Sequence, residues 1–138
     1  MSKFFLDTNI LIYAMDQADQ CKKLRARNLL CSIVDEGHIG VISTQVLQEF
    51  YVASIRKLNL DPVQVKAIMH TFDEFEVVTV TSHLIREAID CSIINRLSFW
   101  DSLIIIAAEV AHCEKIWTED LNDGQIIRGV RVENPFRI

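Results

Sequence analysis

Four acidic side chains lie in apolar segments of the chain, where an ionised carboxylate is costly to bury. They are Asp7 in KFFLDTNILIY (residues 3–13), Glu49 in STQVLQEFY (43–51), Asp101 in SFWDSLIIIAA (98–108) and Asp120 in IWTEDLNDG (116–124). Several acids can share one pocket only if a cation offsets their mutual repulsion. With only oxygen ligands on offer, the cations that fit are Mg²⁺ or Mn²⁺.

Each acid taken alone also has a structural explanation. Asp101 stands in the first turn of a predicted helix, where the helix dipole favours a negative charge by roughly 0.3–1 kcal/mol. Glu49 is predicted to lie half-buried in the middle of a helix, and Arg56, seven residues on, offers it a salt bridge. Four such acids on separate elements are better explained by one shared site.

The predicted elements alternate between strand and helix. Short apolar runs without alternation are typical of buried strands, and they are expected at Lys3 to Asp7, Ile39 to Ile42, Glu76 to Val80, Lys115 to Thr118 and Val130 to Glu133. Helices are expected at Ile10 to Met15, Asp19 to Asp35, Ser43 to Lys57, from Asp61 onwards, Ser82 to Asn95 and Ser98 to Cys113, with Ser43, Asp61, Ser82 and Ser98 as N-caps. This alternation predicts an α/β fold, in which a mostly parallel central sheet is covered by helices on both faces.

The predicted sheet brings two of the acids to one edge. Ligands bind such sheets at the carboxyl ends of the strands. Asp7 ends the first strand, and Asp120 comes just past the strand that ends at Thr118. Asp101 can point to the same edge from the start of its helix. We therefore interpret Asp7 as a metal ligand placed in a core segment.

Composition indicates a folded globular chain. Of its 138 residues 50% are hydrophobic, and two prolines and four glycines leave no linker, so one domain is expected over 1–138. The net charge of −5 argues against a passive nucleic-acid coating protein. It leaves room for an enzyme on nucleic acid, since metal-binding carboxylates count as negative. The basic cluster Lys22 to Arg27 is either a solvated helix face or a phosphate or partner contact.

The chain shows no sign of a membrane segment or a zinc site. No apolar stretch reaches the roughly 18 residues of a membrane span, and no export signal is visible, so we expect a cytoplasmic protein. The four cysteines are far apart and form no C-x-x-C pair. We expect them to be small buried hydrophobes and not zinc ligands.

Taken together, the four acidic motifs resemble the PIN domain, and most closely the short VapC-type toxins of bacterial toxin–antitoxin pairs. The resemblance covers nearly the whole chain and implies a PIN-like three-layer α/β/α sandwich and an Mg²⁺- or Mn²⁺-dependent ribonuclease. It places Asp7, Glu49, Asp101 and Asp120 at the acidic metal site. Asn9 and Thr118 match positions that orient an acid or the substrate.

The resemblance also implies partners: an RNA substrate, a cognate antitoxin whose C-terminal tail docks near the active site, and a second copy of the chain in a homodimer. Asp123 is a rival to Asp120 for the fourth acidic position, because both lie in one loop. We prefer Asp120, which directly follows the strand, and expect its neighbour Glu119 to point to the other side.

Several alternatives stay open. A PIN-type nuclease also fits a role in RNA maturation or decay, or a DNA substrate. A catalytically inactive binding module on the same fold is a further alternative. A receiver-type signalling domain fits less well, because it needs paired acids after the first strand and Asp7 stands alone.

Overall fold

A single sheet organises the chain in the computed structural model, which describes residues 1–137. Within these residues the sheet has six strands in the order β3-β2-β1-β4-β6-β5. The strands are β1 (Lys3–Leu6), β2 (Ile39–Ser43), β3 (Glu76–Val78), β4 (Lys115–Trp117), β5 (Ile126–Ile127) and β6 (Val130–Glu133). All neighbours pair in parallel except β5 and β6, which are antiparallel.

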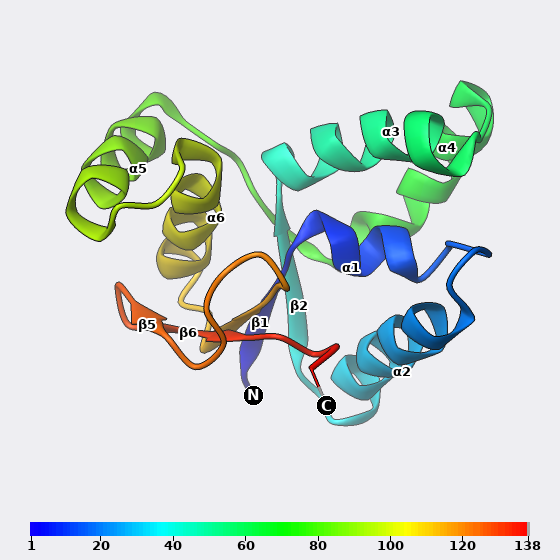
Figure 1. Cartoon of the computed structure of the whole chain (residues 1–138), viewed down its shortest axis with the longest axis horizontal. Helices are drawn as coiled ribbons and strands as arrows, with labels where there is room; N and C mark the ends of the chain where they lie inside the picture. Colours follow the sequence, from blue (N-terminus) through cyan, green and yellow to red (C-terminus); the bar gives the residue numbers. More distant parts are fainter. Residues whose placement is uncertain (138) are drawn as a thin grey trace.

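Helices connect the strands and cover the sheet. They are α1 (Thr8–Tyr13), α2 (Gln20–Asp35), α3 (Thr44–Leu58), α4 (Pro62–Met69), the 3₁₀ segment η1 (His70–Glu74), α5 (Ser82–Asn95) and α6 (Phe99–Val110). Figure 1 shows α5 and α6 on one side of β1 and β2, and α1 and α2 on the other. The result is the expected mostly parallel α/β sheet flanked by helices.

Burial explains why these segments fold as they do. The strand residues Phe5, Leu6, Val41 and Ile116 are fully buried, as strands covered on both faces must be. Helix α6 is buried from Ser102 to Ala108 and contacts β2, β4 and β6. Because α6 packs against three strands, its N-terminal turn, which carries Asp101, is held firmly beside the sheet.

Most predicted boundaries agree with the structure to within a residue or two, and the caps Ser43, Asp61 and Ser98 are confirmed. The prediction of Ser82 as a cap was wrong: Thr81 accepts the amide hydrogen bond from Leu84, and Ser82 is the first helical residue. Helix α1 begins at Thr8 and not at Ile10, because the side chain of Asp7 caps it.

The cysteine prediction was half right. Cys91 and Cys113 are buried, but Cys21 and Cys31 are exposed on α2. Burial raises the pKa of the Cys113 thiol to about 12, which keeps this thiol protonated and unreactive.

Within the described residues no single helix is long and apolar enough to cross a membrane. The consecutive helices α5 and α6 pass that test only as a pair, and they are bent by 116° at their junction.

Candidate active site

The candidate site forms where the strand order reverses. The chain passes from β1 outward to β2 and β3, then returns to the other side of β1 as β4. Leu6 and Trp117, the last residues of β1 and β4, are register partners. The amide of Asp7 donates to the carbonyl of Trp117 at 3.1 Å. The two segments that follow these strands are therefore locked side by side at a position where α/β sheets bind ligands.

Asp7 is the buried centre of the site, with 5% of its surface exposed. Its Oδ1 accepts the amide of Thr8 at 2.7 Å, and its Oδ2 accepts the hydroxyl of Thr118 at 2.7 Å. Burial raises the pKa of Asp7 to about 6, against the lowering effect of these two hydrogen bonds, and the charges of Asp120 and Glu49 raise it further. Both hydrogen bonds fix the orientation of the carboxylate, while desolvation and like charges make its ionised form costly.

Asp120 is exposed and lies at the outer side of the same cavity. Its amide donates to the Thr118 hydroxyl oxygen at 3.1 Å, so Thr118 contacts the backbone of one acid and the carboxylate of the other. Desolvation raises the pKa of Asp120, and the charges of Asp101 and Glu119 raise it further. Two acids with raised pKa values, joined through one hydroxyl, mark a place where a positive charge would be stabilised.

Glu49 reaches the site from α3. The hydroxyl of Thr8 donates to its Oε1 at 2.8 Å. The expectation of a half-buried glutamate was wrong, because Glu49 is exposed. Within residues 1–137 it forms no salt bridge with Arg56. The side chain of Glu49 is therefore held by Thr8, and the alternative explanation of a salt bridge with Arg56 is wrong.

Asp101 stands in the first turn of α6 and is partly buried. The amide of Asp101 donates to the side chain of Ser98, the N-cap of this helix, at 3.0 Å. Its carboxylate is near enough to Asp120 for its charge to raise the pKa of that residue. The cap thus fixes the backbone of Asp101, and the side chain is left for the cavity.

All four acids line one cavity of ≈ 240 Å³. The remaining lining residues are Thr8, Asn9, Gln45, Ala53, Lys57, Trp100 and Ile104. Sequence reasoning missed Gln45 and Lys57. A usable signal was present, because Gln45, Glu49, Ala53 and Lys57 recur every four residues and so share one face of α3. Asn9 also lines the cavity, and its role in positioning an acid or the substrate stays a prediction.

The donor set fits a hard divalent cation. It consists of carboxylate oxygens that repel one another, with a threonine hydroxyl holding one of them in place. In the arrangement described for residues 1–137, no three His, Cys, Asp or Glu side chains are grouped closely enough to ligate one ion together. Such a spread set suits a divalent cation that keeps several of its waters and binds the protein through one or two carboxylates.

Asp123 lies outside this cavity wall. Its Oδ1 accepts the amide of Asn134 at 2.8 Å, and its other oxygen is 3.8 Å from a guanidinium nitrogen of Arg137. These contacts connect the loop after β4 to the C-terminal segment. Of the two acids in this loop, Asp120 lines the cavity and Asp123 does not; the role of Asp120 as the fourth acid stays a prediction.

The predicted basic cluster is divided among separate structural contacts. The ammonium of Lys22 pairs with Glu119 at 3.0 Å and lies 4.4 Å from the ring centre of Tyr13. Arg25 donates to the carbonyl of Pro135 at 2.6 Å, and Arg27 donates to that of Ala14 at 2.7 Å. Lys22, Arg25 and Arg27 therefore tie α2 to neighbouring segments, although Arg25 and Arg27 remain exposed.

Comparison with known proteins identifies the family. Residues 4–124 match the model of the PIN domain, which covers most of the chain, so the chain belongs to the PIN domain family. A search of curated protein sequences gives no significant match.

Solved structures share the fold at low sequence identity. A chain of a toxin–antitoxin complex from Klebsiella pneumoniae is 20% identical, with 100% of both chains covered and a TM-score of 0.71. VapC20 of Mycobacterium tuberculosis, a toxin that cleaves the sarcin-ricin loop, is 18% identical, with 85% of this chain and 91% of that chain covered and a TM-score of 0.69. A chain of DNA-bound VapBC from Salmonella typhimurium is 20% identical, with 98% and 99% covered and a TM-score of 0.68.

Proposed function

We propose that this protein is a metal-dependent endoribonuclease that hydrolyses RNA phosphodiester bonds, and that it serves as the toxin of a toxin–antitoxin pair. The observation that carries the proposal is the placement of Asp7. Its buried carboxylate lies at the reversal of strand order and shares one cavity with Glu49, Asp101 and Asp120. PIN-family membership and the resemblance to solved toxins support the same activity.

We propose that the cation is Mg²⁺ or Mn²⁺. One or two of the four carboxylates of Asp7, Glu49, Asp101 and Asp120 would ligate it directly, and the others would reach it through its waters. When bound, such a cation would lower the pKa of the attacking water and would stabilise the negative charge that develops on the leaving oxygen. The expected products are a 5′-phosphate and a 3′-hydroxyl.

The residues of the chain have separate tasks in this proposal. Thr118 orients the Asp7 carboxylate, and Thr8 orients Glu49. Lys57 is the cationic residue in the cavity wall, and its charge lowers the pKa of Asp120. Lys57 also compensates the charge of an RNA phosphate that enters among the acids. Asn9 offers an amide that positions the phosphate or a water.

The test is cleavage of a pool of structured RNAs by the purified protein in Mg²⁺ or Mn²⁺, with EDTA and Asp7→Asn as controls and the product ends mapped. Discrete cuts that need metal and Asp7 are expected. DNA of the same sequence, run alongside, separates an RNA enzyme from a DNA enzyme. Absence of cleavage together with absence of Mn²⁺ binding would contradict the proposal and favour an inactive binding module.

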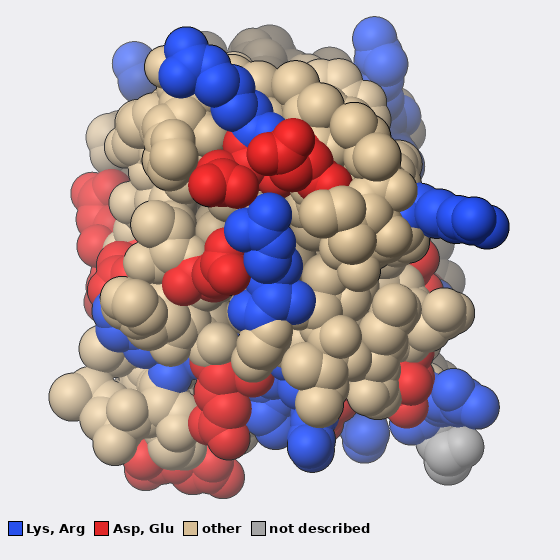
Figure 2. Space-filling model, turned by 90° about the vertical axis from the view of Figure 1, so that its left-hand side faces the viewer, with Lys and Arg blue, Asp and Glu red and all other residues tan. Residues whose placement is uncertain are grey.

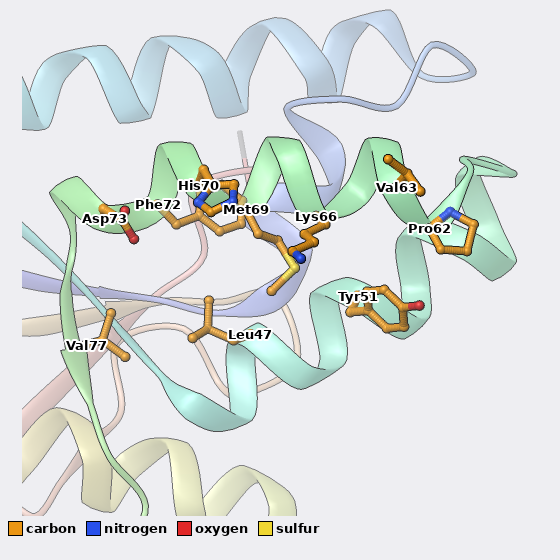
Figure 3. A pocket seen from close by; sticks show the side chains of 10 residues that line it. All are labelled: Leu47, Tyr51, Pro62, Val63, Lys66, Met69, His70, Phe72, Asp73 and Val77. Atoms are coloured by element: carbon orange, nitrogen blue, oxygen red, sulfur yellow. The ribbon is translucent and has the colours of Figure 1, made fainter.

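An antitoxin is the proposed protein partner. An apolar groove of ≈ 500 Å³ lies between α3 and α4, lined by Leu47, Tyr51, Pro62, Val63, Lys66, Met69, His70, Phe72, Asp73 and Val77 (Figure 3). Val63 is 74% exposed there, although valine is usually buried. We propose that an apolar segment of the antitoxin occupies this groove. Co-expression with the product of an adjacent small open reading frame tests this, because Val63→Glu should weaken the complex and leave the fold intact.

A homodimer is the proposed assembly. Helix α5 exposes Ile85, Ile89 and Ile93 at four-residue spacing, and Ile93 is 70% exposed. Figure 2 views the side of the molecule on which α5 and α6 lie, where acidic and basic side chains alternate within a largely uncharged surface. A mixed surface of this kind can pair with its own copy. Light scattering of wild type and of Ile89→Glu measures the state, and a monomer in both would contradict the proposal.

A further inference from the structure

A second groove continues from the acidic cavity along α3. It measures ≈ 490 Å³ and is lined by Gln45, Gln48, Glu49, Val52, Ala53, Arg56, Lys57 and Trp100. Five of these residues also line the acidic cavity, so the two spaces adjoin. A ligand bound among the acids would therefore extend directly into this groove.

Trp100 forms the aromatic side of the groove. It lies next to Asp101 on the first turn of α6 and is 62% exposed, whereas the other tryptophan, Trp117, is 5% exposed. The ring of Phe99 meets the Trp100 ring edge-on, with centroids 5.0 Å apart. Such a large exposed indole beside a charged cavity is a ready platform for stacking a planar group.

Gln45 supplies an unused hydrogen-bonding group where the two spaces meet. The residue is 5% exposed, and its amide nitrogen donates to the carbonyl of Trp100 at 3.3 Å. Its Oε1 is buried without a hydrogen-bond partner. A buried acceptor left unpaired costs free energy, so this oxygen is suited to a donor brought by a ligand.

The opposite side of the groove is basic. Arg56 and Lys57 are both exposed on the last turn of α3. The groove thus combines a cationic rim, a flat aromatic surface and a free amide acceptor. An apolar peptide segment would leave the cations and the amide unpaired, whereas a nucleotide satisfies all three.

We propose that this groove is a nucleobase subsite for single-stranded RNA, which holds a nucleotide next to the phosphate in the acidic cavity. The base stacks on Trp100, a base or ribose donor pairs with Gln45 Oε1, and Arg56 and Lys57 bind the flanking phosphates. This inference rests on the proposed ribonuclease function. It narrows the substrate to RNA whose bases are unstacked at the cleavage point, as in loops and bulges.

The test measures the binding of a mixed-sequence RNA hexamer to the Asp7→Asn protein in Mg²⁺, with tryptophan fluorescence as the readout. Stacking should quench the Trp100 emission, while the buried Trp117 reports no change. Adding Trp100→Ala should weaken binding about 5- to 150-fold, the usual range for one base–aromatic stack. Trp100→Phe should keep most of the affinity and remove the quenching. Ile94→Ala, a control at an apolar position that is 75% exposed on α5, should change neither.

The basic rim is tested by the salt dependence of the same binding. Removing Arg56 and Lys57 together should lower the slope of log affinity against log salt by about 0.7 for each phosphate that the two side chains neutralise in the wild-type complex. The control double variant, Arg86→Ala with Arg131→Ala, removes two exposed cations elsewhere and should leave the slope unchanged.

Unchanged affinity in Trp100→Ala, equal binding of the hexamer and of its duplex, or no binding at all would overturn the subsite. Cleavage by the wild-type protein is measured separately, so the two proposals can fail independently. Trp100-dependent binding without cleavage would contradict the ribonuclease proposal and support the subsite. Cleavage with an unchanged KM in Trp100→Ala would contradict the subsite and support the ribonuclease proposal.

Discussion

The Thr118 hydroxyl donates to the buried Oδ2 of Asp7 at 2.7 Å, across 111 residues of sequence. The same oxygen accepts the amide of Asp120 at 3.1 Å. One hydroxyl therefore holds the carboxylate of the first acid and the backbone of the last. Thr118 is 1% exposed, so both contacts are shielded from bulk water.

Thr118→Val should destabilise the protein and weaken its metal binding. Valine keeps the shape but leaves the Asp7 oxygen and the Asp120 amide without their partner, at a cost of about 1–3 kcal/mol. The hydrogen bond from Thr118 lowers the pKa of Asp7, so its loss should raise that pKa further and disfavour the ionised ligand. Denaturant unfolding and Mn²⁺ titration measure both effects. Thr118→Ser keeps the hydroxyl and should restore metal binding; equal losses in both variants would contradict the explanation.

The metal-free protein should lose stability as the pH rises from about 4 to about 6. Asp7 has a pKa of about 6 in the folded protein against an ordinary value of 3.8, so the folded state holds this proton over that range while the unfolded state has released it. The unfolded state then binds fewer protons, and the free energy of unfolding falls with pH by roughly 3 kcal/mol in total. Above about pH 6 the full penalty is present.

Asp7→Asn serves as the matched variant for this pH effect. An asparagine can accept from the Thr8 amide and donate to the Thr118 oxygen, so it fits the same position without a charge. Its metal-free form should be more stable than wild type at pH 8, by up to the same 3 kcal/mol, and about equal at pH 4. Urea unfolding in EDTA at the two pH values measures the difference. If Asp7→Asn were less stable than wild type at pH 8, burial of the ionised Asp7 carboxylate would not be the cost that we infer.

The sequence allowed the fold and the edge of the sheet to be predicted, because strand ends and caps are local patterns. Asp7 and Asp120 were expected at one edge on that ground, and the structure places them there. The exposure of Glu49 was missed, because helical periodicity gives the direction of a side chain and not what covers it. Strand β5 was missed too, since two residues with no flanking pattern form a strand only through pairing with β6.

Mn²⁺ should raise the melting temperature of the wild-type protein, and the gain should depend on the four cavity acids. Binding to the folded state alone stabilises it by mass action, by about 2.7 kcal/mol at a metal concentration one hundred times Kd. Asp101→Asn and Asp120→Asn should each reduce this gain, because each removes a carboxylate from the cavity. Thermal unfolding with and without Mn²⁺ measures it.

Asp123→Asn is the control that separates the two acids of the loop. Asp123 binds the amide of Asn134 outside the cavity, so its replacement should leave the Mn²⁺-dependent gain in melting temperature unchanged. A small loss of basal stability is compatible with this role. If Asp123→Asn lost the Mn²⁺-dependent gain in melting temperature while Asp120→Asn kept it, Asp123 and not Asp120 would be the fourth acid.

Glu119→Gln should lower the pKa of Tyr13 and loosen the loop that carries Asp120. Desolvation raises the pKa of the Tyr13 phenol, and the hydrogen bond to the Glu119 carboxylate raises it further. Glu119 also pairs with Lys22 of α2, and because both side chains are partly exposed the ion pair contributes only about 0.2–1 kcal/mol. The neutral glutamine removes the charge from both contacts. Ultraviolet titration of the phenols should show Tyr13 ionising at lower pH than in the wild-type protein. Glu114→Gln, at an exposed glutamate, is the control, and a Tyr13 titration that matches wild type in Glu119→Gln would show that the carboxylate does not act on the phenol.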